Sequence, residues 1–166
     1  ALLIEELTKQ KLHEVFNEKI FLPLQLNDTY FEFFQPAKIN LHVVYPYYET
    51  HSLKEVNTSF DWGGGGLIST MNNLDIFIRS LISGKLFKKE ETLLAMLKFK
   101  NYTTNNSSKR LPLYGLGLQK KVIAGYSFFG HISAYGSLMF YDPEKDISII
   151  LSLNQVAAMH KAEWLM

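Results

Sequence analysis

Cysteine is absent from this chain of 166 residues. The chain can therefore form no disulfide framework, offer no thiol nucleophile and supply no thiolate ligand to a metal. It also lacks any apolar run that approaches the roughly 18 residues of a membrane-spanning helix. Its net charge is only +1, which gives no reason to expect nucleic acid or an acidic membrane surface as a partner.

Several signatures of catalytic and metal sites are missing as well. There is no Gly-x-Ser-x-Gly elbow, and His13-Glu14 lacks the second histidine that a His-Glu-x-x-His zinc site requires. His42 and His51 have no other ligands around them at metal-binding spacing. The Asp and Glu residues form no obvious carboxylate pairs, and we interpret them as solvated surface charge. We therefore expect no metal and no cofactor.

Four consecutive glycines occupy residues 63–66. Glycine allows the backbone to adopt positive φ or to approach another group closely. A phosphate-binding loop would continue with Lys-Ser or Lys-Thr, whereas Leu67-Ile68 follows here. We therefore predict a tight turn packed against a helix and reject a phosphate site.

Apolar and aromatic residues are plentiful. The hydrophobic fraction is 47%, with 12 Phe and 9 Tyr, and a chain of this length can bury roughly 70% of its unfolded surface. One packed domain is therefore expected. Predicted helices come first, predicted antiparallel strands come last, and a closing helix follows them. This segregation predicts an α+β fold.

The first part of the chain carries helical patterns separated by loops. Apolar residues at i, i+3, i+4 and i+8 predict a helix over residues 10–20, which Pro23 ends. Residues 36–60 show no clean period and predict a long ordered loop with short extended pieces. A helix is predicted over residues 89–99, and the polar residues 101–110 predict an exposed loop.

The strongest helix signal lies in the middle of the chain. Thr70 is a suitable N-cap, with Asn73 at the position where a capping box would have Glu or Gln. Gly84 suits the position just after a helix end. Together with an apolar stripe, these signals predict a helix over residues 71–83.

The last part of the chain predicts antiparallel strands. Residues 113–120 open a strand, and Gly125 turns it toward the next one. Residues 126–153 predict a β-hairpin made of one long strand, a tight turn over residues 142–146, and a second strand with one apolar and one mixed face. Asp142 is expected to accept hydrogen bonds from the turn backbone.

Both ends of the chain run in helical periodicity. Residues 1–7 enter an apparent helix without a cap, and residues 160–166 stop inside another. We interpret residues 1–166 as a single domain that forms part of a longer protein.

A series of short motifs in a fixed order resembles the C-terminal part of the serine β-lactamase-like family. The family includes class C β-lactamases, D-alanyl-D-alanine carboxypeptidases and related esterases. Each motif is weak alone, but their order across most of the chain is specific. The motifs lie at residues 12–16, 20–24, 28–30, 63–70, 74–77, 114–117 and 130–154.

The resemblance implies acyl transfer without a cofactor or metal. In the family, the serine of Ser-x-x-Lys attacks an amide or ester carbonyl, the lysine and the tyrosine of Tyr-x-Asn handle protons, and the acyl-enzyme is then hydrolysed. A third motif, Lys or His followed by Thr/Ser-Gly, lies on a strand at the cleft, and His131-Ile132-Ser133 matches its position. His131 would supply a donor or a positive charge, and Ser133 and Ala134 would contact the substrate. The Ala134 N–H would be one of two oxyanion-hole donors.

The chain departs from the family pattern in three motifs. It contains no Ser-x-x-Lys and no Tyr-x-Asn. The segment most similar to Ser-x-x-Lys is Ser107-Ser108-Lys109-Arg110, which ends in Arg. In the third motif, Ile132 replaces a hydroxyl residue and Ser133 replaces glycine. Ile132 would remove a substrate hydrogen bond if its side chain faced the cleft, and Ser133 could crowd the substrate carbonyl. For His131, Ser133 and Ala134, a structural role in strand packing stays open.

Two functions follow from the resemblance. The first is a serine hydrolase acting on a peptide, amide or ester, of which this chain is an inactive C-terminal part. The alternative is a non-catalytic binding or regulatory relative with the same fold. The resemblance further implies a bacterial cell-envelope or secreted location for the full-length protein. An exposed sheet edge or exposed terminal helices would favour a homodimer.

Overall fold

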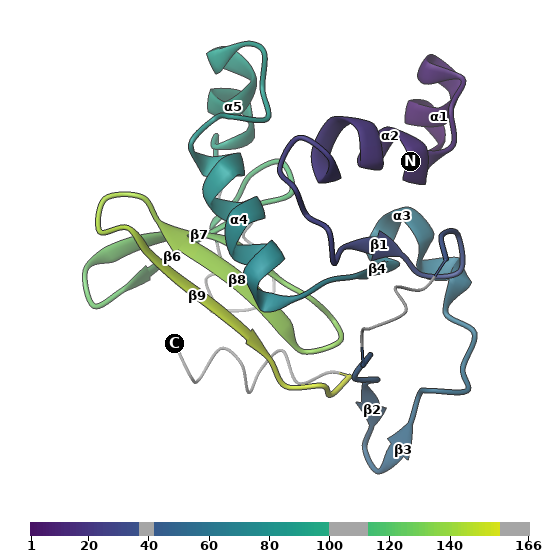
Figure 1. Cartoon of the computed structure of the whole chain (residues 1–166). Coiled ribbons are helices and arrows are strands. Elements are labelled where there is room, and N and C mark those ends of the chain that lie inside the picture. Colours follow the sequence, from purple (N-terminus) through teal and green to yellow (C-terminus); the bar gives the residue numbers. More distant parts are fainter. Residues whose placement is uncertain (37–41, 100–112, 157–166) are drawn as a thin grey trace, which may run out of the picture.

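The computed structural model describes residues 1–36, 42–99 and 113–156, and it confirms an α+β architecture (Figure 1). Short helices and two-residue strands form the N-terminal part, and an antiparallel sheet forms the C-terminal part. The predicted loop over residues 101–110 and the predicted closing helix over residues 160–166 lie outside the described residues.

The helices are α1 (Leu2–Thr8), α2 (Leu12–Phe16), the π-helical turn η1 (Asn17–Phe21), the 3₁₀ turn η2 (Ser59–Asp61), α3 (Trp62–Gly65), α4 (Met71–Ile82) and α5 (Glu90–Met96). The strands are β1 (Tyr30–Phe31), β2 (Tyr47–Tyr48), β3 (His51–Ser52), β4 (Leu67–Ile68), β5 (Leu113–Tyr114), β6 (Gln119–Ile123), β7 (Tyr126–Ile132), β8 (Ser137–Asp142) and β9 (Ile147–Ser152).

The main sheet is a five-stranded antiparallel meander in the order β5-β6-β7-β8-β9. Each strand pairs with the next one along the chain, so that Gly130 lies opposite Phe140 and Phe140 opposite Ile149. Ala124 and Gly125 have φ of 50° and 88° at the β6–β7 connection. Two successive residues at positive φ are typical of a tight hairpin turn, which confirms the turn predicted at Gly125.

The prediction of one long strand after residue 126 is wrong, because a four-residue turn at residues 133–136 divides it into β7 and β8. The Ser133 N–H donates to the Ser137 carbonyl at 2.7 Å, and the Gly136 N–H donates to the Ser133 carbonyl at 3.1 Å. Gly136 has a φ of +82°, where a side chain is strained, and a Cβ there would lie 2.8 Å from the Gln155 carbonyl oxygen. The apolar pattern resumes directly after the turn, so alternation alone did not reveal the reversal.

The turn predicted over residues 142–146 is confirmed between β8 and β9. The Asp142 Oδ1 atom accepts from the Glu144 N–H at 2.8 Å and from the Lys145 N–H at 3.2 Å. Asp142 is only 2% exposed, so the general interpretation of acidic residues as solvated charge is wrong for it. Its carboxylate is buried because it satisfies the amides of the turn.

The two faces of the sheet pack into different clusters. One face lies under α4, which packs on β8 and β9 (Figure 1). That face contributes Phe129, Met139 and Tyr141 to a cluster with the buried side of α4. The opposite face contributes Phe128, Ile132, Leu138 and Phe140 to a second cluster.

Helix α4 confirms the helix predicted over residues 71–83. The Thr70 Oγ1 atom accepts from the Asn73 N–H at 3.3 Å, and Gly84 follows the helix at a φ of +81°. The Asn73 side chain also reaches outside the helix: its Oδ1 atom accepts from the Asp28 N–H and from the Thr29 hydroxyl, both at 3.0 Å. This buried network ties the start of α4 to the segment before β1.

The helix predicted over residues 10–20 is present as α2 followed by η1, in which the hydrogen bonding changes to the wider π pattern. Its apolar side packs Leu12 and Phe21 into a cluster with Phe31 of β1. The helix predicted over residues 89–99 is present as the shorter α5. The short extended pieces predicted within residues 36–60 correspond to β2 and β3.

Gly63, Gly64 and Gly65 lie in the helical turn α3, and Gly66 is its C-cap, directly before β4. Gly63 packs tightly, since a Cβ on it would lie 3.2 Å from Leu12 Cδ2 in α2 and 2.5 Å from Ala1 Cβ. The prediction of a turn packed against a helix is confirmed at this position.

No helix within the described ranges is long and apolar enough to cross a membrane. Among the same residues, no three His, Cys, Asp or Glu side chains gather where they could hold a metal ion.

Candidate functional site

His131 is the penultimate residue of β7, and Ile132 separates it from the turn at residues 133–136. Its side chain is half-buried, and Met139 of β8 lies opposite it in the pairing register. The hydroxyl of Tyr114 on β5 lies 3.3 Å from the His131 Nδ1 atom. The two rings meet edge to face, with centroids 5.9 Å apart. Tyr114 therefore holds the imidazole from the edge of the sheet.

Burial lowers the pKa of His131 below its usual value. The imidazole is therefore neutral at neutral pH, which favours a role as hydrogen-bond donor over a role as positive charge. In the tautomer whose Nδ1 accepts from the Tyr114 hydroxyl, the proton is carried on Nε2. That tautomer presents an N–H donor on the far side of the ring from Tyr114.

Ile132 does not share the side of the sheet on which His131 lies. It is 4% exposed and packs with Phe128, Leu138 and Phe140 in the cluster on the opposite face. Successive residues of a strand point to opposite faces, so a cleft beside His131 would not be occupied by the Ile132 side chain. The Ile132 side chain is therefore part of the core on the face opposite His131.

Ser133 and Ala134 lie together in the β7–β8 turn. The Ser133 Oγ atom accepts from the Tyr135 N–H at 3.2 Å, so its side chain bonds to the turn itself. Ala134 is exposed, and its N–H has no acceptor within the parts of the chain that the structure describes. The turn therefore offers one free backbone donor beside the end of β7.

A second group of polar side chains, which the sequence patterns did not indicate, meets the same turn. The Tyr135 hydroxyl donates to Asp61 Oδ2 at 2.5 Å. Burial raises the pKa of Tyr135 to about 12, with help from the Asp61 carboxylate and from Glu32. The pKa of Glu32 is also raised, first by burial and then by Asp61, while a hydrogen bond from Thr58 opposes the rise. Asp61 and Glu32 are thus a second exception to the interpretation of acidic residues as solvated charge.

No short motif could have revealed this group. Asp61 and Tyr135 are 74 residues apart in sequence. Tyr135 lies within the motif at residues 130–154, but no sequence pattern pairs it with Asp61. Tyr114, by contrast, lies in the Tyr-Gly-Leu-Gly motif at residues 114–117. That motif indicated a strand and contributed to the family resemblance, but it did not indicate a contact with His131.

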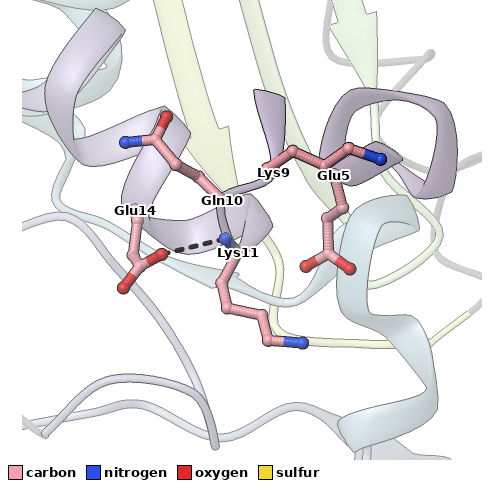
Figure 2. A pocket seen from close by; sticks show the side chains of 5 residues that line it. All are labelled: Glu5, Lys9, Gln10, Lys11 and Glu14. Atoms are coloured by element: carbon pink, nitrogen blue, oxygen red, sulfur yellow. Dashed lines mark hydrogen bonds between the residues drawn. The ribbon is translucent and has the colours of Figure 1, made fainter. Parts of the chain in front are cut away.

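A pocket of about 260 Å³ lies elsewhere, between α1 and α2, and is lined by charged and polar side chains (Figure 2). Two of its carboxylates bond to the start of α2: Glu5 accepts from the Leu12 N–H at 2.8 Å and Glu14 from the Lys11 N–H at 2.9 Å. Figure 2 shows the latter contact as a dashed line. Since these carboxylates satisfy free helix amides, we assign this pocket a structural role.

Comparison with known proteins links the chain to one family. The family model described as Beta-lactamase matches residues 1–164. The chain is similar to a D-stereospecific amidohydrolase from Streptomyces sp., at 22% identity and a TM-score of 0.78, over 94% of this chain and 47% of that one. It is also similar to a D-amino acid amidase from Ochrobactrum anthropi SV3, at 19% identity and a TM-score of 0.79, over 98% of this chain and 52% of that one.

A third similar structure is an octameric penicillin-binding protein homologue from Pyrococcus abyssi, at 23% identity and a TM-score of 0.69. The match covers 98% of this chain and 39% of that one. The chain thus spans about half the length of the structures it matches, or less. At these identities the three structures establish the fold.

Proposed function

The chain belongs to the beta-lactamase family, and from this premise we propose that it forms the C-terminal part of a longer serine hydrolase. The reaction is hydrolysis of an amide, ester or peptide bond through an acyl-enzyme. The observation that carries the proposal is the position of His131 at the end of β7, next to a turn in which Ala134 is exposed and its N–H has no acceptor among the described residues. A side-chain donor and a backbone donor are thereby placed within a few residues of each other.

In this proposal His131 is a neutral donor to the substrate or to its proton network. The burial that lowers its pKa and the Tyr114 hydroxyl at 3.3 Å both support this role. The Ala134 N–H would be one of two donors to the oxyanion of the tetrahedral intermediate. Ser133 would contribute backbone and not its hydroxyl, because its Oγ atom bonds to the Tyr135 N–H.

The nucleophile is assigned to sequence outside these 166 residues. No Ser-x-x-Lys and no Tyr-x-Asn occur in the chain, and the chain covers only 47% of the Streptomyces amidohydrolase and 52% of the Ochrobactrum amidase. We therefore propose that the chain alone does not turn over substrate.

An amide of a D-amino acid is the substrate class that the comparisons favour. One similar structure is named a D-amino acid amidase, and another is named a D-stereospecific amidohydrolase. A D-alanyl-D-alanine carboxypeptidase or an esterase would use the same acyl-enzyme chemistry on a related carbonyl.

The second candidate is a non-catalytic binding or regulatory relative. It was favoured by Ile132 and Ser133 in the third motif, where the family has a hydroxyl residue and glycine. The geometry weakens both arguments, since Ile132 is buried on the other face of the sheet and Ser133 Oγ is engaged within the turn.

Acylation of the full-length protein tests the proposal. The protein is incubated with a fluorescent penicillin and, separately, with the p-nitroanilide amides of D- and L-phenylalanine. We expect covalent labelling or release of nitroaniline, with the D-amide preferred, and a loss of about tenfold or more in His131→Ala. A full-length protein that neither becomes labelled nor releases nitroaniline would support the binding relative instead. Labelling of the 166-residue chain by itself would contradict the assignment of the nucleophile to other sequence.

We further propose that the chain by itself associates with a second copy. Helix α1 leaves Leu2, Leu3 and Leu7 exposed by 74%, 68% and 75%. Within the described residues β9 is the last strand of the sheet and has no partner strand on its outer side, and such edges recruit other chains. The octameric state named for the Pyrococcus homologue supports association within the family.

A further inference from the structure

We propose that Tyr135 and Asp61 are positioning residues that hold the β7–β8 turn, and with it the Ala134 N–H, in place for the reaction. This inference rests on the proposed function, which assigns that N–H to the oxyanion hole. It adds two residues to the site, one of them from the segment that precedes α3.

The contact joins two distant parts of the fold. Tyr135 is the third residue of the turn at residues 133–136, and Asp61 is the last residue of η2. The Tyr135 hydroxyl donates to Asp61 Oδ2 at 2.5 Å, and both side chains are partly buried. A hydrogen bond to a carboxylate is stronger than one between neutral groups, so this contact restrains the turn more than an ordinary surface bond would.

Hydrogen bonds within the sheet fix the shape of the turn but leave its other side free. The Ser133 and Gly136 amides close the turn on itself, and the Leu153 N–H donates to the Gly136 carbonyl at 3.0 Å. These partners lie in the turn itself, at the start of β8 (Ser137) and just after β9 (Leu153). Within the described residues, the bond from Tyr135 to Asp61 is the hydrogen bond that ties the turn to the helical part of the molecule.

Hydrogen bonds also hold Asp61 in place. The Asp61 N–H donates to the carbonyl of Thr58, the N-cap of η2, at 2.9 Å. The Thr58 hydroxyl bonds to Glu32 Oε2 at 3.5 Å, and the Glu32 N–H donates to the Gly66 carbonyl at 3.0 Å. Asp61, which accepts from Tyr135, is therefore connected through Thr58 to Glu32, the residue after β1, and from there to Gly66, the residue after α3.

Restraint of the turn matters for the proposed reaction because it fixes the direction of the Ala134 N–H. An oxyanion donor is effective when it is aimed in advance at the position where the negative charge develops. Misplacement by about 1 Å can reduce the rate by roughly 10²-fold. The Ala134 N–H belongs to the peptide between Ser133 and Ala134, one residue before Tyr135, so a fixed Tyr135 side chain limits the motion of that N–H.

Steady-state kinetics of the full-length protein test the proposal, with the D-phenylalanine p-nitroanilide as probe. Tyr135→Phe and Asp61→Ala each remove the hydrogen bond, and we expect kcat to fall about tenfold or more while KM changes by less than about twofold. Asp61→Asn keeps a side-chain oxygen that can accept from the Tyr135 hydroxyl, and it should retain most of kcat. Tyr126→Phe is the matched control, because Tyr126 starts β7, the strand that leads into the turn, and is 44% exposed.

Outcomes that reflect folding alone can be separated from positioning. A purely structural role would lower the melting temperature of Tyr135→Phe while kcat and KM of the folded protein stayed at the wild-type values, and this result would overturn the proposal. An equal fall of kcat in Tyr126→Phe, or in Asp61→Asn, would also overturn it.

Failure of the proposed function would look different. If the wild-type full-length protein does not act on the amides and is not labelled by penicillin, the hydrolase assignment fails first. Hydrogen exchange of the Ser133, Tyr135 and Gly136 amides then decides whether the restraint exists. Faster exchange in Tyr135→Phe but not in Tyr126→Phe supports it, and unchanged exchange refutes it.

Discussion

The protonation of His131 is expected to make the stability of the folded chain depend on pH. Its pKa in the folded chain is lowered by burial, and the Tyr114 hydroxyl lies 3.3 Å from its Nδ1 atom. As pH falls through the unfolded value of about 6.5, the unfolded state binds a proton before the folded state does. The stability contributed by the neutral imidazole is therefore present above that pH and is lost below it.

This asymmetry predicts the behaviour of a His131→Gln variant. Between pH 7.5 and 5.5 the wild type should lose more of its free energy of unfolding than the variant does, as measured by urea denaturation at each pH. His51→Gln is the control, because His51 lies exposed on the two-residue strand β3. Equal losses in the wild type and in His131→Gln would contradict the burial argument.

Tyr135 gives a second prediction at the residue scale. Its pKa is raised to about 12, first by burial and next by the hydrogen bond to Asp61. The neutral phenol is thus favoured in the folded state, and stability is lost as pH rises from about 10 toward about 12. Burial also raises the pKa values of Tyr30 and Tyr141, so spectrophotometric titration should show several late tyrosines, one of which disappears in Tyr135→Phe. In Asp61→Asn this tyrosine should titrate earlier, yet still above its ordinary value, because burial remains; a titration identical to the wild type would contradict the assignment.

At the scale of the elements, the start of α4 depends on Asn73. Its side chain accepts from the Asp28 N–H and the Thr29 hydroxyl, and Asn73 is 3% exposed. Asn73→Ala leaves these donors without their acceptor, and we expect a loss of about 1–3 kcal/mol in the free energy of unfolding. Asn72→Ala is the control, because Asn72 is the residue directly before Asn73 in the helix and is exposed. This variant should change the free energy of unfolding by less than about 0.5 kcal/mol. Similar losses in the two variants would show that the network contributes nothing specific.

The pairing of β7 with β8 depends on Gly130. A Cβ at this position would lie 1.9 Å from the Met139 carbonyl oxygen and 2.7 Å from Phe140 Cα. Gly130→Ala should therefore push the strands apart, destabilise the chain by about 1–3 kcal/mol or more and displace the adjacent His131. Gly64→Ala is the control, because no atom lies within 4 Å of its Cβ position. Thermal unfolding of both variants checks the prediction, and a Gly130→Ala protein as stable as the wild type would contradict it.

The helices and turns were predicted best where capping and turn residues act locally. Thr70 and Gly84 bracket α4, and Asp142 satisfies the amides of the turn after β8, as their sequence context indicated. The reversal between β7 and β8 was missed, because the apolar pattern resumes directly after it, although Ser133 and Gly136 are residues that turns favour. Small residues also occur within strands, so strand pairing decides that the chain turns here.

At the scale of the whole molecule, the open edge of β9 and the exposed apolar side of α1 predict self-association of the isolated 166-residue chain. Multi-angle light scattering should give a mass of at least two chains. Leu2→Glu combined with Leu7→Glu should reduce that mass if α1 forms the contact. The matched control, Leu22→Glu, changes a residue that is also exposed but lies beyond η1. A monomeric mass for the unmodified chain would contradict the prediction.

The sequence by itself determined the α+β class, the limits of α4, the turn at Asp142 and the family to which the chain belongs. Each of these depends on residues close together in sequence or on motifs whose order can be read directly. The tertiary structure decided which side of the sheet each side chain occupies, and it placed Ile132 in the core while His131 meets Tyr114. It also brought Asp61 to Tyr135 across 74 residues of sequence. Such contacts depend on how strands pair and helices pack, and no local pattern specifies them.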